Sequence, residues 1–415
     1  MTGDADAIVV GAGMAGATLA LSLSGAGLRV ALIDPMPFEV QTAPTFDGRA
    51  SAVSFAAFRQ WRAIGAASCI APHAQRIEQI LVTDGRSPGA AAPPPGPAWL
   101  RFDASEITDA TQGEPLGYLI ENRHIRAGLA HAVAAAEIEV LAPNAVVSLE
   151  AGTAATRVTL DDGRVLTAPL VVGADGRASL VRRQSNIGAL GWGYGQSGMV
   201  ATVALEHDHR GVAYEHFLPA GPFAILPLTG RRASLVWTES TRRGAALAEA
   251  REEVFVAYLK RRFGSFLGGV APCGPRFVHP LSFQLADRLI GPRVALIGDS
   301  AHAIHPIAGQ GLNMGLKDAA ALAEVVIDAV RLGEDLGAPT VLRRYDRWRG
   351  VDNVGVALAT DAFNRLFSND HPLPRLVRGA GMALVNRIGP ARRFFMREAG
   401  GAVGELPRLL RGEAL

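Results

Sequence analysis

Residues 8–16 read IVVGAGMAG, and this stretch decides the fold. An apolar run that ends in a glycine-rich turn predicts a buried β-strand followed at once by a helix. Gly11 permits the tight turn, Gly13 lets the backbone approach a pyrophosphate, and Gly16 lets the helix pack close to the strand. We expect the phosphate on the helix N-terminus, where free N–H groups and the helix dipole favour negative charge.

A second apolar run at residues 30–33 ends in Asp34. It comes roughly 20 residues after the glycines, where a carboxylate can accept the ribose hydroxyls of an adenosine. An acid at this position, where an Arg or Lys would accommodate a 2′-phosphate, favours FAD or NAD. The alternative is an ordinary glycine-rich turn between a strand and a helix, which the ordered strand, helix and terminal acid make the weaker interpretation.

The composition limits the class of protein. A chain of 415 residues with a net charge of +2 predicts two or three domains and no nucleic-acid partner. Cys69 and Cys273 lack metal or redox spacing, so we interpret them as core thiols of a reduced, intracellular protein. The apolar stretch 8–28 follows Asp4 and Asp6 and is interrupted by glycines, so we expect neither a signal peptide nor a membrane span, and a cytoplasmic location.

Buried strands of the parallel type recur at residues 8–10, 170–172 and 293–297. The region 194–237 alternates like an antiparallel sheet. This order predicts one nucleotide-binding domain of the α/β class, assembled from discontinuous pieces, with an antiparallel sheet inserted between them. Helices are expected over 123–135 and 311–331.

Three further motifs favour FAD over NAD. They are GADG at 173–176, GDSAH at 298–302 with the later HP and GQGLN at 305–306 and 309–313, and DGR at 47–49. With LGYLIEN at 116–122, FLPAGP at 217–222 and YDRWR at 345–349, these motifs make the chain resemble the class A flavin-dependent aromatic hydroxylases. The closest resemblance is to the branch that hydroxylates ring intermediates of ubiquinone biosynthesis, and it extends over nearly the whole chain.

The resemblance implies a Rossmann-like FAD-binding domain of the glutathione-reductase and p-hydroxybenzoate-hydroxylase type, with an inserted antiparallel β-sheet substrate domain and C-terminal helices. The expected pieces are residues 1–75 with 100–182 and 283–345 for the FAD domain, 76–99 with 183–282 for the substrate domain, and 346–415 for the helical region.

The same resemblance assigns roles to polar residues and glycines. Asp299 is expected to accept hydroxyls of the ribityl chain or to cap a helix, and Arg49 to lie over the pyrophosphate and flavin unless it is a solvated loop arginine. Asp175 and Gly176 match a motif used for FAD and the nicotinamide donor, or form an ordinary turn. Arg182 either pairs with Asp175 or lies on the surface. The full expected cofactor set is Gly11, Ala12, Gly13, Ala15, Gly16, Asp34, Arg49, Asn122, Arg123, Asp175, Gly176, Asp299, Pro306, Gly309, Gln310, Gly311, Leu312 and Asn313.

No Ser/His/Asp or Cys/His arrangement demands a nucleophilic side chain, so the chemistry is expected to belong to the flavin. The resemblance implies a flavin C4a-hydroperoxide that delivers one oxygen atom from O2 to a phenolic ring. His302 and His305 lack further ligands nearby, so no metal is expected. The expected substrate pocket comprises Phe217, Pro219, Pro222, Leu226 and Pro227, which could instead be core residues of the inserted sheet.

No second dinucleotide fingerprint is present, so the reductant is expected to be transiently bound NAD(P)H or an electron-transfer protein. Residues 371–415 hold eight Arg and three Glu with interleaved apolar residues. Such a segment can lie on an anionic membrane surface, which would suit a prenylated substrate, or pack on the protein body. Other enzymes of ubiquinone biosynthesis are possible partners.

Two other functions share the fold: a reductase of prenyl double bonds and a non-catalytic, flavin-loaded subunit of a biosynthetic complex. A flavin halogenase is rejected, because Lys260 and Lys317 are poorly placed to carry the halogen and the chain has no Trp-x-Trp pair.

Overall fold

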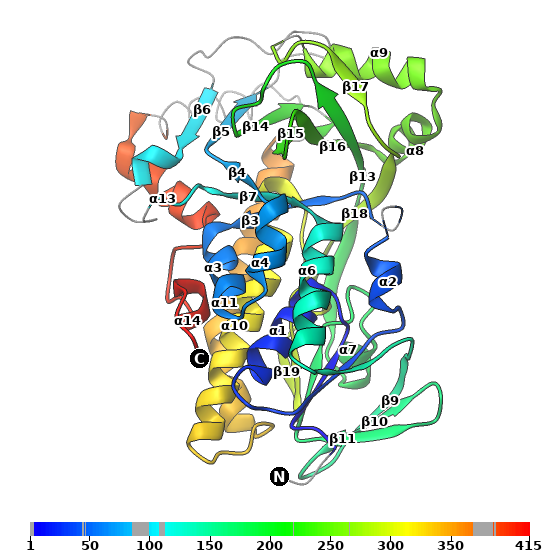
Figure 1. Cartoon of the computed structure of the whole chain (residues 1–415), viewed down its shortest axis with the longest axis vertical. Helices are drawn as coiled ribbons and strands as arrows, with labels where there is room; N and C mark the ends of the chain where they lie inside the picture. The colour runs from blue at the N-terminus through cyan, green and yellow to red at the C-terminus, as the bar shows by residue number, and fades with distance from the viewer. Residues whose placement is uncertain are drawn as a thin grey trace.

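The strand that precedes the glycine turn lies inside a six-stranded sheet in the computed structural model (Figure 1). The structure describes residues 4–43, 45, 47–84, 99–107, 113–218, 220–264, 266–367, 385 and 387–415. The sheet order is β19 (Ile290–Gly291), β20 (Val294–Leu296), β12 (Leu170–Gly173), β1 (Ala7–Val10), β2 (Val30–Ile33) and β8 (Glu139–Leu141). All neighbours pair in parallel except β19 with β20.

Continuous apolar runs form these strands because both faces of the sheet are covered. Every residue of β1, β2, β12 and β20 is buried. Helix α1 (Met14–Ser24) is apolar on all sides and buried from Gly16 to Leu23, which explains the long apolar stretch near the N-terminus. Within the described residues, no helix combines the length and apolar character needed to cross a bilayer.

A nine-stranded sheet forms the second layer of the molecule. Its path is β21 (His302–Ala303), β18 (Phe277–Ala286), β13 (Ala189–Leu205), β16 (Arg232–Ser240), β15 (Gly221–Leu228), β14 (Val212–Leu218), β5 (Gln79–Asp84) and β6 (Trp99–Asp103), with β17 (Val270–Pro272) paired to β13. Only β14 and β5 pair in parallel. Residues 100–103 therefore belong to this sheet, and not to the nucleotide-binding pieces in which we expect them from the sequence.

Two small sheets complete the strands. They are β9 (Val146–Ala151), β10 (Thr156–Leu160) and β11 (Val165–Ala168), and β3 (Ala50–Ser54), β7 (Gly117–Glu121) and β4 (Gln75–Ile77). In the first, β10 and β11 form an antiparallel pair, and the second lies between the two large sheets in Figure 1.

Helices cover the sheets on both sides. The remaining ones are α2 (Phe38–Gln41), α3 (Phe55–Ala63), α4 (Ala67–Ile70), α6 (Asn122–Ala135), α7 (Leu180–Gln184), α8 (Thr241–Glu249), α9 (Glu252–Phe263), α10 (Gln310–Arg331), α11 (Pro339–Phe367), α13 (Gly389–Ala399) and α14 (Arg408–Arg411). Helices α10 and α11 run side by side beneath the nine-stranded sheet, and α8 and α9 cover the outer face of that sheet (Figure 1). The α/β class with an inserted antiparallel sheet is confirmed, and the helices expected at 123–135 and 311–331 are present as α6 and α10.

Candidate active site

Three loops that follow neighbouring parallel strands meet at one edge of the six-stranded sheet. Gly11 follows β1, Ala174 follows β12 and Gly298 follows β20. Gly11 has φ +108°, and a Cβ built there would lie 2.3 Å from the Ala174 carbonyl oxygen. Only glycine lets these loops come so close. In open α/β sheets, ligands bind at the carboxyl ends of the strands, so this edge is the candidate site.

The glycine turn holds one glycine that packs against the protein backbone and one whose Cβ position is open. A Cβ on Gly16 would lie 1.9 Å from the Gly11 carbonyl oxygen, whereas a Cβ on Gly13 would meet no protein atom within 4 Å in the described residues. Helix α1 starts at Gly13 without a side-chain cap and without an acid in its first turn. Its first N–H groups and the empty space at Gly13 therefore fit a pyrophosphate.

Asp34 lies at the end of β2 and is buried. Its two oxygens accept the N–H groups of Ala12, at 2.7 Å, and Met36, at 2.8 Å. Burial raises the pKa of Asp34, and these hydrogen bonds only partly oppose it. Each carboxylate oxygen retains a second lone pair, so the side chain both fixes the glycine turn and can accept a ribose hydroxyl.

The DGR loop is held by a buried carboxylate that sequence reasoning left without a role. Asp47 accepts Nε of Arg49 at 2.9 Å, Nδ2 of Asn122 at 3.1 Å and a guanidinium nitrogen of Arg126 at 2.9 Å. Burial alone would raise the pKa of Asp47, but the arginines hold it well below its ordinary value. Asn122 also accepts the Ser51 hydroxyl at 2.7 Å. Its amide is thus directed at the loop that carries Arg49.

Arg123 is the second residue of α6 and follows Asn122 of this network. One guanidinium nitrogen lies 3.2 Å from a Glu121 oxygen, and its buried Nε has no hydrogen-bond partner in the described part of the chain. A buried N–H without an acceptor is costly, so this group fits an anionic ligand oxygen.

The GADG loop after β12 uses its acid as a helix cap. Asp175 accepts the Ser179 hydroxyl at 2.5 Å and the Leu180 N–H at 2.7 Å, at the start of α7. Gly176 has φ +77° and open space at its Cβ position. Both expectations for Arg182 are wrong: its side chain is buried and donates to the carbonyls of Ser300, at 2.8 Å, and of Arg177, at 2.9 Å. It therefore ties the loop after β12 to the loop after β20.

Asp299 points out of the turn after β20 and is 49% exposed. Its nearest cation is Arg177, with Nε 3.4 Å from Oδ2, and Arg177 also donates to the Ser282 hydroxyl at 3.2 Å. No helix follows Asp299 directly, because the chain continues through β21 before α10 begins, so the cap interpretation does not apply. The carboxylate is available to ligand hydroxyls.

The GQGLN segment forms the start of α10. Gly309 has φ +63°, a left-handed conformation that favours glycine, and a Cβ there would lie 3.0 Å from that of Ala52. Asn313 accepts the Ser54 N–H and donates to the Ala52 carbonyl, both at 2.9 Å, which fixes the helix start against β3. Gln310, Gly311 and Leu312 are half-buried, Pro306 is exposed, and the Cβ position of Gly311 is open.

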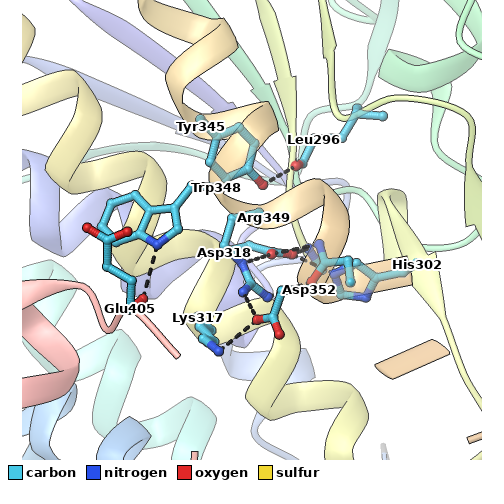
Figure 2. Close-up of polar contacts among 11 residues, drawn as sticks. Leu296, His302, Lys317, Asp318, Tyr345, Trp348, Arg349, Asp352 and Glu405 are labelled. Carbon is cyan, nitrogen blue, oxygen red and sulfur yellow. Dashed lines mark hydrogen bonds and ion pairs between the residues drawn. The ribbon is translucent and has the colours of Figure 1, made fainter. Parts of the chain in front are cut away.

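A buried ion network fixes the turn that carries Asp299 and helix α10 to one another (Figure 2). Asp318 on α10 accepts His302 Nε2 at 2.6 Å, Arg349 Nε at 2.9 Å and the Gly298 N–H at 3.1 Å. Burial would raise the pKa of Asp318, but His302 and Arg349 hold it well below its ordinary value. Arg349 also pairs with Asp352, which Lys317 contacts at 2.7 Å. His302 is thus a structural residue of this network.

The sequence contained a signal for this network: Asp318 interrupts an otherwise apolar and small face of α10. Within the described chain, no group of three or more His, Cys, Asp or Glu side chains is arranged to hold a metal ion. The interpretation of both cysteines as core thiols is wrong, because Cys273 is exposed and Cys69 half-buried.

The nine-stranded sheet turns one face towards the start of α10. Phe217 packs on Ile307, just before Gly309, and lies opposite Pro222 on the neighbouring strand. Leu226 follows on the same face as Pro222, whereas Pro227 points to the opposite face, beside Ala233 in the cluster under α9. The register thus puts three of the expected pocket residues on one face and Pro227 on the other, and Leu226 packs in the cluster of Ala213, apart from Phe217 and Ile307. Pro219 lies outside the described residues.

The comparisons with known proteins agree with this geometry. The family described as FAD binding domain matches residues 4–349. Ubiquinone hydroxylase UbiL of Rhodospirillum rubrum is 45% identical over 99% of this chain and 94% of its own length. The 3-demethoxyubiquinol 3-hydroxylase of Escherichia coli is 33% identical over 94% of this chain and 97% of its own. The crystal structure of p-nitrophenol 4-monooxygenase PnpA from Pseudomonas putida matches with a TM-score of 0.78 at 18% identity, over 97% of this chain and 99% of that one, which shows the shared fold.

Proposed function

This chain belongs to the family of FAD-dependent hydroxylases, and from that premise we propose that it hydroxylates the aromatic ring of a polyprenylated phenol on the route to ubiquinone. It is a flavin monooxygenase that uses O2 and a reductant. The observation that carries the proposal is the end-to-end identity of 45% with a relative named as a ubiquinone hydroxylase. The apolar sheet face around Phe217, packed on Ile307 beside Gly309, supports a hydrophobic substrate there.

We assign the cofactor contacts by chemistry. The N–H groups at Gly13 would bind the pyrophosphate, Asp34 the adenosine ribose and Asp299 the ribityl hydroxyls. Arg49 and Arg123 would supply positive charge along the phosphates. The N-terminus of α10 at Gly309, Gln310, Gly311, Leu312 and Asn313 would stabilise negative charge on the reduced ring.

Bound FAD supplies the activated oxygen, and the side chains around it exclude water and orient the phenol. The reductant is proposed to be NAD(P)H that binds transiently, or a protein donor. The test is purified protein reconstituted with FAD and incubated with NAD(P)H, heavy-isotope O2 and 2-(3-methylbut-2-enyl)phenol. Gain of one labelled oxygen atom in the phenol supports hydroxylation. Gain of two hydrogen atoms instead would identify a prenyl reductase, and no change with any reductant would favour a non-catalytic subunit.

The C-terminal region supports a proposal on membrane contact. Helix α13 presents Phe394, 53% exposed, and Phe395, 40% exposed. Phe394 lines a surface hollow with Arg393 and Arg397. An exposed aromatic pair beside arginines is typical of a helix that lies on an anionic membrane surface, from which a prenylated substrate could enter. Other enzymes of ubiquinone biosynthesis are proposed as further partners.

A further inference from the structure

One carboxylate lies on the face of the nine-stranded sheet that turns towards the start of α10. Glu215 is on β14, two residues from Ala213 and two from Phe217. Side chains alternate along a strand, so these three share one face. Tyr214 and His216 point the other way and contact aromatic rings on the α9 side of the sheet.

The neighbours of Glu215 on its own face fix where it points. Phe217 packs on Ile307, in the segment that ends at Gly309. On the other side, the Ala213 cluster includes Ala52, whose Cβ is the atom nearest to a Cβ built on Gly309. Glu215 therefore projects between two groups of side chains that both adjoin the loop proposed to hold the flavin ring.

The carboxylate has no partner of its own. The residues opposite it on the flanking strands are Val82 on β5 and Ala224 on β15, neither of them polar. It makes no hydrogen bond or ion pair with any residue in the described part of the chain. Glu215 keeps some accessible surface, yet burial raises its pKa to about 7. An unpaired carboxylate in an apolar setting costs stability, and such groups concentrate at functional sites.

We propose that Glu215 is the catalytic residue that accepts the proton of the substrate's phenolic hydroxyl. This inference rests on the proposed function, because it requires a phenol in the space beside Gly309. The side chain lies on the face that carries the proposed substrate residues Phe217, Pro222 and Leu226.

The phenol O–H bond breaks, its proton passes to Glu215, and the electron pair moves into the ring as a ring carbon bonds one atom of O2 and the O–O bond breaks. NAD(P)H supplies the two electrons that reduce the other oxygen atom to water, and bound FAD would carry them. The hydroxylated carbon then loses its hydrogen to water as a proton, and Glu215 returns its own proton to the phenol oxygen. General-base assistance of this kind typically contributes about 10²–10⁴ in rate.

The test compares two phenols that differ in ionisation. One is 2-(3-methylbut-2-enyl)phenol, which is neutral at the assay pH, and the other is a ring-fluorinated analogue that is already ionised there. With Glu215→Gln, the kcat for product from the neutral phenol should fall about 100-fold or more. The same variant should hydroxylate the ionised analogue at a rate within about threefold of that of the unmodified protein with this analogue, because an ionised phenol needs no general base. Glu215→Asp should recover part of the loss.

Exposed Glu249 on α8 gives the matched control, since Glu249→Gln should leave both rates unchanged. Equal losses with both phenols in Glu215→Gln, at unchanged FAD content, would show a merely structural role and overturn the inference, as would an undiminished rate with the neutral phenol. If the unmodified protein hydroxylates neither probe, the proposed function itself fails, which is a distinct result.

Discussion

The backbone N–H of Gly298 donates to the carboxylate of Asp318 at 3.1 Å, directly beneath the turn that carries Asp299. The same carboxylate contacts His302 and Arg349. One buried acid therefore fixes the turn after β20 to both α10 and α11 (Figure 2). The two segments proposed to contact the ribityl chain and the flavin ring thus keep a fixed separation.

Asp318→Asn should unfold the protein more easily and lower its FAD content. Removal of one member of a buried ion network leaves the other charges uncompensated, which costs about 3–5 kcal/mol. Urea unfolding and the ratio of flavin to protein absorbance measure the two effects. Asp352→Asn is the matched control, since Asp352 pairs with the same Arg349 but is partly exposed, and its loss should be clearly smaller. Equal losses would contradict the role assigned to the Gly298 contact.

Substitution of the second and third glycines of the turn, Gly13 and Gly16, should impair different properties of the protein. Gly16→Ala places a methyl group against the Gly11 carbonyl and should destabilise even the flavin-free protein by about 1–3 kcal/mol, as overpacking does. Gly13→Ala has open space in the protein and should leave that stability unchanged, while FAD affinity falls about tenfold or more, equal to about 1.4 kcal/mol. Unfolding curves without FAD and flavin titrations separate the two. Unchanged FAD binding in Gly13→Ala would remove the pyrophosphate from this position.

Stability should decline as the solution is acidified below neutral. Burial lowers the pKa of His216 from its ordinary 6.5 to about 4. Between these values the unfolded chain binds a proton that the folded protein does not, so the contribution is complete above about pH 6.5 and decreases towards pH 4. The full effect is about 3 kcal/mol at one pKa unit per 1.36 kcal/mol. Urea midpoints across this range should fall less steeply in His216→Phe than in exposed His131→Gln, and parallel slopes would exclude His216 as a cause.

Membrane contact should depend on the aromatic pair of α13. Replacement of Phe394 and Phe395 by Ser should reduce binding to vesicles of anionic phospholipid several-fold, because apolar area inserted at the interface is lost. Val351→Ser on α11, which removes an apolar side chain that is 82% exposed, is the control and should bind as before. Flotation assays give the bound fraction. Equal binding by all variants would show that another surface is responsible.

Glu215→Gln should stabilise the folded protein at alkaline pH. A carboxyl group whose pKa is raised from 4.5 to about 7 is neutral in both states below pH 4.5, and above about pH 7 its buried charge disfavours folding. The amide removes that charge, so the free energy of unfolding at pH 8 should rise by about 1–3 kcal/mol. Urea unfolding at pH 5 and pH 8 checks this, and a gain of the same size at both would contradict it.

Features of the site that depend on residues close together in the sequence could be predicted from the sequence alone. The glycine turn, the acid after β2 and the start of α10 each follow from spacing along a few residues. The partners of Asp47, Asp318 and Arg182 could not be predicted, because those contacts join segments that the fold alone brings together. Glu215 was detectable in principle: strand alternation places an acid at an apolar position between Ala213 and Phe217. Only the register showed which way that position faces.

The strand order also bears on how the chain folds during synthesis. β20 pairs with β12, yet 120 residues lie between the end of β12 at residue 173 and the start of β20 at residue 294. At a translation rate of about 5–20 residues per second, the edge of β12 stays unpaired on the ribosome for about 6–24 s. The unpaired N–H and C=O groups of such a strand edge can pair with a strand of another nascent chain. We therefore expect the newborn polypeptide to depend on chaperones until its last third has emerged.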